Sequence, residues 1–471
     1  MRGIEGRATV AARRTDAAAV RPWPGAGASS GVVWLLRLTM LALLLGLGAC
    51  SRGGPETGVS LDFWAMGREG ERVRALVAEF ERSHPGIRVR VQQIPWSAAH
   101  EKLLTAYAGD VMPDVYQLGN TWIPEFVALR ALAPLGQRVR DSDEVSAGDF
   151  FPGILEANRI DGRLWGIPWY VDTRLLFYRK DLLARAGYTA MPASWPEWEG
   201  LMQALVETGP EGAHAILLPL DDWTPPVVFA MQLGAGLLRD EARYGDFLAP
   251  AFARAFGLYL DLFDRGWAPG PGTMNRADLY QAFGRGEVAM AITGPWNIAG
   301  FAERLPPATQ GLWETAPLPA PHAPGPGLST AGGASLVVSR ASEHPEAAWQ
   351  LVEYLSTTDS QIRFHALTGD LPARRSAWEA AGLKEAPHTR AFWVQLQHVR
   401  AVPRIPEWER IADKIAYYAE VAVRGEMSRE QALRALNADA DRILEKRRWL
   451  LDRQGGGASG GAPARSDDDG R

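Results

Sequence analysis

The sequence predicts an α/β protein, because its globular part opens with a strand, a helix and a second strand. Apolar and polar side chains alternate along Val59–Phe63 and again along Ile87–Val91, which is typical of strands. Between them, apolar residues from Val73 to Phe80 recur at helical spacing until His84–Gly86 breaks the pattern. Such a unit favours a parallel sheet, and the length of 471 residues favours two or three lobes.

Later segments continue this mixture of elements. A helical stripe follows the start signal at Pro345, and Ser428–Gln431 forms a capping box that opens a last long helix. The proline-rich stretch Ala316–Gly327 cannot be a helix or a central strand, so we expect a surface crossing there. From residue 449 to 471 the chain has few apolar residues, which predicts a disordered tail.

The N-terminal 49 residues have the pattern of a secretory signal. The short apolar run Leu38–Ala49 follows a basic flank and ends directly before Cys50, the only cysteine. This ending resembles a bacterial lipobox, which implies a lipid on Cys50 and a flexible tether over residues 50–58. A transmembrane anchor is the alternative, but it needs roughly 20 apolar residues. Arg13-Arg14 could indicate twin-arginine export, although the pair lies far from the apolar run.

Composition excludes several classes of function. Without residues 1–49 the chain carries a net charge of about −9, so the basic patch of a nucleic-acid-binding protein is not expected. The eight histidines form no HExxH motif and no Cys/His cluster, and no phosphate-binding glycine loop occurs. We therefore expect neither a metal nor an organic cofactor.

Several stretches, taken together and in order, carry a family resemblance. They are LDFWAMG (Leu61–Gly67), PDVYQLGNTWIPEF (Pro113–Phe126), DGRLWGIPWYVDTRLLFYRKDLLARAGY (Asp161–Tyr188), FGRGEVAMAITGPWNIAG (Phe283–Gly300), GGASLVVSRASEHPEAAWQLVEYL (Gly332–Leu355) and TGDLPARRSAW (Thr368–Trp378). The set resembles the bacterial extracellular solute-binding proteins, family 1, of sugar ABC transporters, in the maltose- and trehalose-binding class. Its order and spacing cover nearly all of residues 58–445.

The resemblance implies a two-lobed periplasmic-binding-protein fold of type II, with a ligand cleft that closes between the lobes. Each lobe is then discontinuous in sequence. The N-terminal lobe combines residues 59–170 with 317–370, and the C-terminal lobe combines 171–316 with 371–445. The implied hinge crossings lie near Tyr170–Asp172, Pro317 and Thr368–Pro372.

A sugar site needs aromatic planes for the C–H faces of the rings and charged or amide groups for the hydroxyls. Trp296 follows the apolar run EVAMAIT in the motif GPWN, and loops at strand ends are where open α/β folds place ligands. Packing in a core is the alternative for any single tryptophan. The candidate tryptophans are Trp64, Trp122, Trp223 and Trp296.

Each polar candidate also has a structural alternative. Asp114 could brace a turn, Asp172 could be neutralised by Arg174, and Glu69 could simply favour a helix N-terminus. Arg374, with its fork of donors, competes with Arg375 for a place in the site. The other candidates are Asn120, Tyr170 (on the same side of its strand as Asp172), Gly332 and Gly333 (a close approach of backbone to ligand or a tight turn).

The sequence thus predicts a non-catalytic, extracytoplasmic and monomeric receptor that delivers an oligosaccharide or similar polyol to an ABC permease. One alternative keeps the fold but binds a polyamine, glycerophosphodiester or other non-sugar solute. Another is a secreted glycosidase that uses Asp114 and Asp172, and it would need two carboxyl groups roughly 5 to 9.5 Å apart.

Overall fold

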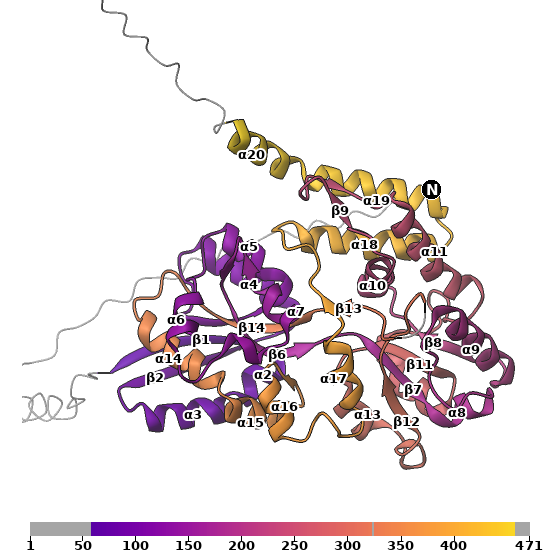
Figure 1. Cartoon of the computed structure of the whole chain (residues 1–471), viewed down its shortest axis with the longest axis horizontal. Coiled ribbons are helices and arrows are strands. Elements are labelled where there is room, and N and C mark those ends of the chain that lie inside the picture. Colours follow the sequence, from indigo (N-terminus) through magenta and orange to yellow (C-terminus); the bar gives the residue numbers. More distant parts are fainter. Residues whose placement is uncertain (1–57, 323–324, 457–471) are drawn as a thin grey trace, which may run out of the picture. The chain divides into compact units, whose positions relative to one another are not determined.

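The computed structural model describes residues 58–322 and 325–456, and two β-sheets organise them (Figure 1). Both sheets are covered by helices, so the α/β prediction is confirmed. The predicted signal, Cys50 and most of the tether lie outside the described residues.

The first sheet has six strands and contains the predicted strand–helix–strand unit. In sheet order they are β15 (Leu371–Pro372), β6 (Ile167–Asp172), β14 (Gly332–Val338), β3 (Val115–Gly119), β1 (Val59–Met66) and β2 (Ile87–Ile94). Strand β1 pairs in parallel with β2 and with β3, as the opening pattern predicts. The sheet is mixed as a whole, because β14 runs antiparallel to both β3 and β6, and β15 antiparallel to β6.

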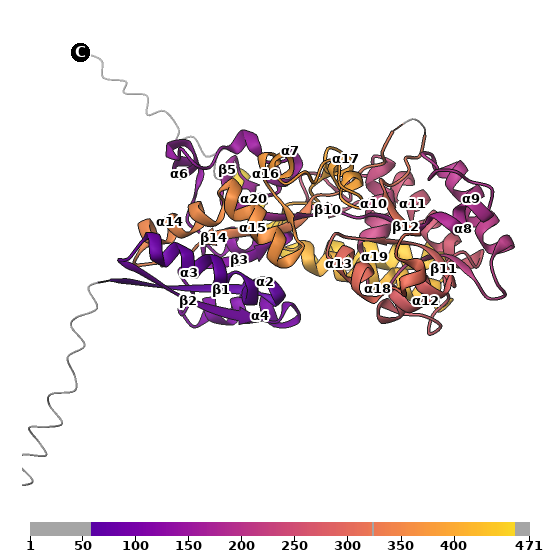
Figure 2. The ribbon, with the colours of Figure 1, turned by 90° about the horizontal axis from the view of Figure 1, so that it is seen from below.

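Helices cover both faces of the six-stranded sheet (Figure 2). On one face Leu61 and Phe63 of β1 share a core cluster with residues of α3, α14 and α15, and on the other Tyr116 and Leu118 of β3 share a cluster with residues of α4 and α5. The elements of this part are α2 (Gly67–Arg72), α3 (Arg74–Ser83), α4 (Trp96–Ala108), η1 (Asn120–Trp122), α5 (Ile123–Ala128), α6 (Gly136–Asp141), η2 (Ala147–Asp149), α7 (Pro152–Ala157), β4 (Arg159–Ile160), β5 (Arg163–Leu164), α14 (Pro345–Leu355), α15 (Thr358–Thr368) and α16 (Arg375–Ala380).

The second sheet has four strands, which are in order β12 (Trp313–Ala316), β7 (Leu175–Arg179), β11 (Val288–Thr293) and β8 (His214–Leu217). Every residue of β11 is buried, because helices pack on both of its faces. The elements around it are α8 (Lys180–Arg185), α9 (Trp195–Thr208), α10 (Thr224–Gln232), β9 (Leu238–Arg239), β10 (Tyr244–Gly245), α11 (Pro250–Asp264), η3 (Arg276–Asp278), α12 (Leu279–Arg285), α13 (Asn297–Arg304), η4 (Pro307–Thr309), β13 (Ser329–Thr330), α17 (Arg390–Leu396), β16 (Val399–Arg400), α18 (Trp408–Val423), α19 (Arg429–Ile443) and α20 (Glu445–Gly456).

The chain passes between the two sheets over short distances in sequence. Only Thr173 and Arg174 separate β6 of the first sheet from β7 of the second. The return runs from the end of β12 at Ala316 to the start of β14 at Gly332. The lobe boundaries given above, including the placement of 371–445 in the C-terminal lobe, stay a prediction.

Helix signals in the sequence match the observed starts. Pro345 occupies the first turn of α14, and Ser428 and Gln431 form the reciprocal capping box of α19. Between Ala316 and Gly327 the described residues beyond β12 contain no helix, as expected for a proline-rich run. The run is not wholly at the surface, since Leu318 is 1% exposed and belongs to the second-sheet core.

The predicted start of the tail at residue 449 is wrong. Helix α20 continues to Gly456, because Glu445–Gln454 is composed largely of good helix formers. Arg448 also anchors this helix by donating to the backbone oxygens of Arg243 and Asp441. Residues 457–471 lie outside the described residues.

Candidate ligand-binding site

A pocket of about 530 Å³ lies where strands of both sheets end. Its lining includes residues at or just after the carboxyl ends of β1, β2, β3 and β6 in the first sheet, and of β8 and β11 in the second. Loops at the carboxyl ends of strands are the usual binding edge of open α/β sheets.

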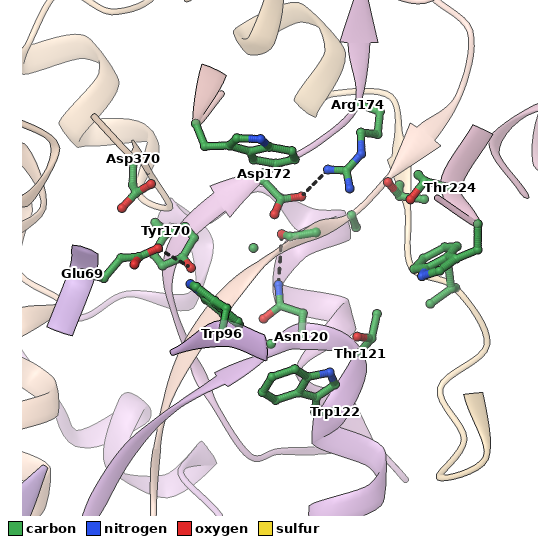
Figure 3. A pocket seen from close by; sticks show the side chains of 18 of the residues that line it. Glu69, Trp96, Asn120, Thr121, Trp122, Tyr170, Asp172, Arg174, Thr224 and Asp370 are labelled. Carbon is green, nitrogen blue, oxygen red and sulfur yellow. Dashed lines mark hydrogen bonds and ion pairs between the residues drawn. The ribbon is translucent and has the colours of Figure 1, made fainter. Parts of the chain in front are cut away.

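The lining mixes aromatic rings, acids and arginines with small residues (Figure 3). The rings are Trp96, Trp122, Tyr170, Trp223 and Trp296, the acids are Glu69, Asp172 and Asp370, and the arginines are Arg68 and Arg174. The remaining positions are Gly119, Asn120, Thr121, Thr224, Thr330, Ala331, Gly332, Gly333 and Val402.

A chain of hydrogen bonds holds the acidic corner of the pocket. The Tyr170 hydroxyl donates to Glu69 Oε1 at 3.2 Å, and Gln117 Nε2 donates to the Tyr170 oxygen at 3.0 Å. Gln117 in turn accepts from the backbone N–H of Met66 at 2.7 Å. The Tyr170 ring is therefore fixed from β3, and it presents Glu69 to the pocket.

Burial dominates the ionisation of this corner. It raises the pKa of Glu69, and it raises the pKa of Asp370 to about 7, with the negative charge of Glu69 contributing in the same direction. It also raises the pKa of Tyr170 well above its ordinary value. Withdrawing a carboxyl group from water disfavours the charged form, and a second carboxyl nearby adds to that effect.

On another side of the pocket, Arg174 lies among two acids and a tryptophan. Its guanidinium stands 3.7 Å from Asp172 Oδ1, 3.9 Å from Asp222 Oδ2 and 4.5 Å from the centre of the Trp296 ring. Burial raises the pKa of Asp172, and the charge of Arg174 opposes that rise. Trp296 as a residue is 37% exposed.

Glycines bring strand β14 close to the Asp172 carboxylate. Gly332 pairs with Asp172 in the register of β14 and β6, and a Cβ on Gly332 would lie 2.0 Å from Asp172 Oδ1. Gly333 has a φ of 108°, which favours glycine. Asn120 Nδ2 donates to the Gly332 oxygen at 3.1 Å, and the Asn120 oxygen accepts from Ser335 at 2.8 Å. Asn120 therefore supports the pocket wall through its own side chain.

Two pairs of tryptophans set the orientation of rings in the lining. Trp96 and Trp122 meet edge to face with ring centres 5.7 Å apart, and Trp223 meets the buried Trp408 in the same way at 5.6 Å. Such contacts hold rings in defined orientations and leave other parts of their surface for a ligand.

The structure brings most of the predicted site residues together. Those that line the pocket are Glu69, Asn120, Trp122, Tyr170, Asp172, Trp223, Trp296, Gly332 and Gly333. Three predicted residues, Asp114, Arg374 and Trp64, do not line it, and Cys50 lies outside the described residues.

Asp114 is corrected from a ligand to a structural residue. It directly precedes β3, whereas the pocket is lined by residues at the far end of that strand. Its carboxylate accepts from the backbone N–H of Asp62 at 2.8 Å and from the Ser342 hydroxyl at 2.5 Å. This is the bracing role that was the alternative for Asp114.

Arg374 and Trp64 are corrected for similar reasons. The Arg374 side chain donates to Asp149 at 2.7 Å and to the backbone oxygens of Glu144 and Ser356 at 2.8 and 3.1 Å, so its donors are used inside the fold. Its competitor Arg375 does not line the pocket either. Trp64 alternates with the buried Phe63 and packs instead on the side of α4, with Lys102 4.9 Å from its ring centre.

Some pocket residues were missed, although a signal existed for most of them. Trp96 follows β2 in the segment IPW, which repeats the strand-end logic used for Trp296. Asp370 lies in the motif TGDLPARR, four residues before the predicted ligand Arg374. Arg174 follows Asp172 by two residues, and that spacing indicated only an ion pair. For Arg68, Thr121 and Thr224, nothing in the sequence distinguishes them from ordinary loop residues.

Within residues 58–322 and 325–456, no cluster of His, Cys, Asp and Glu side chains has the arrangement of a metal site. Over the same ranges, none of the helices has the length and apolar character needed to cross a membrane.

Comparison with known proteins identifies the family of the chain. Residues 66–362 match the model of a family described as bacterial extracellular solute-binding protein. Among solved structures, the sugar-binding protein MalE from the phytopathogen Xanthomonas citri is 46% identical with a TM-score of 0.80, over 84% of this chain and 99% of that chain. A binding protein of Brucella abortus (strain 2308) is 27% identical over 417 residues, which are 84% of this chain and 98% of that protein. The diacetylchitobiose binding protein DasA of Streptomyces coelicolor is 23% identical over 381 residues, or 80% and 88% of the two chains.

Proposed function

The chain belongs to the bacterial extracellular solute-binding proteins, and from that membership we propose that it captures a sugar in the pocket described above and delivers it to an ABC permease. The ligand is an oligosaccharide or a similar neutral polyol. Relatives that bind sugars support this, namely the MalE protein of Xanthomonas citri and the diacetylchitobiose binding protein of Streptomyces coelicolor.

The observation that carries the proposal is the mixture of groups in one pocket. Five aromatic rings provide planes for the C–H faces of sugar rings, and the carboxyl and guanidinium groups between them can replace water at the hydroxyls. A sugar hydroxyl both donates and accepts, so it can bond to an acid and an arginine at once. Asp172 and Arg174, 3.7 Å apart, offer that combination.

The same mixture weighs against a charged solute. A polyamine would favour acids without arginines, and an anion such as a glycerophosphodiester would favour arginines without acids. Three acids line the pocket, Glu69, Asp172 and Asp370, and two arginines line it with them, Arg68 and Arg174. A neutral ligand with many hydroxyls suits this balance best.

The proposal includes the setting in which the protein works. It is extracytoplasmic, monomeric and attached to the membrane by a lipid on Cys50, and its family members are binding proteins, so it holds the sugar without cleaving it. The permease and the lipid are the remaining partners.

Calorimetric titration of the purified protein with maltose, trehalose and longer oligosaccharides tests the proposal. At least one sugar should bind tightly and be recovered intact. Trp296→Ala and Asp172→Asn should each weaken that binding by about tenfold or more. The first change removes a stacking plane, and the second removes a charged acceptor. Trp449→Ala is the matched control, since Trp449 is 54% exposed and lies outside the pocket. Absence of binding, or release of cleaved sugar, would refute the proposal.

A further inference from the structure

Arg174 occupies an unusual place in the pocket. It is one of the two residues that separate β6 of the six-stranded sheet from β7 of the four-stranded sheet. Its backbone oxygen accepts a hydrogen bond from Ser329 at 2.8 Å, and its side chain is only 17% exposed. The backbone of Arg174 is therefore held at the junction of the two sheets, and its side chain is mostly covered there.

Three segments converge on this guanidinium. Asp172 comes from the end of β6, Asp222 from the loop after β8, and Trp296 from the loop after β11. The distances of 3.7, 3.9 and 4.5 Å are those of charge attraction and cation–π contact, and the two carboxylates lie beyond hydrogen-bonding distance. Arg174 Nε is buried and finds no hydrogen-bond partner among the described residues.

The contrast with other buried arginines is informative. Arg179 donates to Asp181 through two bonds of 2.8 Å and to the Phe283 backbone oxygen at 2.7 Å. Arg374 is saturated in a similar way. These two arginines brace the fold with their donors, whereas Arg174 influences its neighbours mainly through its charge and its position.

We propose that Arg174 is a positioning residue for ligand binding, which keeps Asp172 ionised as a hydrogen-bond acceptor and fixes the orientation of the Trp296 ring. This inference rests on the proposed function, in which Asp172, Arg174 and Trp296 contact the sugar, and it adds a positioning role for Arg174 to that direct contact. The exposed part of the Trp296 ring remains available for stacking.

The charges around Asp172 support this role. Apart from Arg174, the titratable groups near Asp172 are Tyr170 on its own strand and the carboxyl groups of Asp222 and Asp370, none of which carries a positive charge. Burial raises the pKa of Asp172 and Arg174 lowers it. At Asp222 burial acts in the same direction, but the charge of Arg174, hydrogen bonds from Thr224 and the charge of Arg276 together outweigh it, and the pKa falls. Loss of Arg174 should therefore leave a half-buried carboxylate that takes up a proton more readily.

The ionic coupling can be tested without any sugar. Thermal unfolding of the wild type, Arg174→Gln, Asp172→Asn and the double variant is followed from pH 4 to pH 8. At pH 8, Asp172→Asn should stabilise the Arg174→Gln protein more than it stabilises the wild type, because Arg174 no longer offsets the negative charge of the Asp172 carboxylate. This excess should shrink as the pH falls. Equal effects of Asp172→Asn in both backgrounds at every pH would overturn the proposal.

The second test measures maltose and trehalose affinity against pH. Arg174→Gln should bind these sugars about tenfold more weakly at pH 7. As the pH is lowered, its sugar affinity should begin to fall at a higher pH than that of the wild type, because the pKa of Asp172 has risen. Arg174→Lys keeps the charge and should restore the pH profile. Wild-type affinity and an unchanged profile in Arg174→Gln would contradict the proposal.

Arg265→Gln is the matched control for both tests. Arg265 stands 4.8 Å from the Trp267 ring centre and 3.8 Å from Glu199, so it has the same kinds of contact outside the pocket. Its replacement should leave the affinity for sugar, and the dependence of that affinity on pH, unchanged. If the wild type binds neither sugar, the proposed function fails for these ligands, and the unfolding experiment still decides whether Arg174 and Asp172 are coupled.

Discussion

Among single residues, the acidic corner of the pocket shows a conflict between stability and binding. Glu69 and Asp370 are both buried in the lining, and the pKa of each is raised by that burial. An acid with a raised pKa lowers the free energy of unfolding as the pH rises above its unfolded-state pKa, so a contribution to stability at neutral pH does not explain these two groups. Hydroxyl groups of a bound sugar would donate hydrogen bonds to these carboxyl groups.

Asp370→Asn tests this conflict through its pH dependence. The pKa of Asp370 is raised from 3.8 to about 7, so the stability it contributes in its protonated form is lost as the pH rises between those values. The variant should therefore gain stability over the wild type from pH 4 to pH 7, by an amount on the order of a few kcal/mol that levels off above pH 7. Chemical denaturation at pH 4.5, 6 and 8 measures this gain. A difference that does not change with pH would show that Asp370 ionises normally.

The sequence predicted the residue types of the site better than it predicted the individual positions. Asp172 and Asp114 are both acids beside apolar runs, yet only Asp172 lies at the pocket edge of its strand. Which end of a strand faces a pocket depends on chain direction within the sheet. The donors of Arg374 are used by Asp149 and by backbone oxygens distant in sequence, which no local pattern reveals.

Among secondary-structure elements, the contact between β14 and β6 determines the geometry of the pocket most directly. Gly332 faces Asp172 and Gly333 faces Val171 across the two strands, and the register shifts just beyond, between Ala334 and Ser335. Without side chains on this pair, β14 approaches β6 closely enough for the Asp172 carboxylate to lie over Gly332. The carboxylate position is thus set by a missing Cβ on the neighbouring strand.

Gly332→Ala should disturb that position. The added Cβ would lie 2.0 Å from Asp172 Oδ1, so the carboxylate or the strand has to move. We expect a loss of about 1–3 kcal/mol in stability from overpacking, and a several-fold loss of sugar affinity, measured by thermal unfolding and calorimetric titration. Gly311→Ala is the matched control, because nothing lies within 4 Å of its added Cβ. Unchanged sugar binding in Gly332→Ala would separate the glycine from the site.

Periodicity and capping signals predicted elements well where local chemistry determines them. The strand–helix–strand opening and the helix starts at Pro345 and Ser428 are confirmed. The sheet order was not predictable in this way, since β14 enters between β3 and β6 from a segment more than 150 residues further along the chain. The tail was misplaced because α20 combines good helix formers with exposed apolar residues such as Trp449.

For the described chain as a whole, the family resemblance predicted the fold further than periodicity alone, and the match over residues 66–362 confirms it.

The arrangement of the two sheets bears on how the pocket works. The pocket lining comes from loops of both sheets, while the strands beneath them are buried and well packed. Relative movement of the two sheets would therefore be absorbed in the connecting segments, of which 173–174 is the shortest named above.

If the two sheets belong to separate lobes, as predicted, sugar binding should draw them together. Small-angle X-ray scattering should then give a smaller radius of gyration with saturating sugar than without it, because the ligand contacts loops from both sheets at once. Asp172→Asn and Trp296→Ala, mixed with sugar at the same concentration, should remain close to the ligand-free value. Scattering that is identical with and without sugar, in a sample shown by calorimetry to be saturated, would mean that the pocket is preformed and that the predicted hinge crossings do not act as hinges.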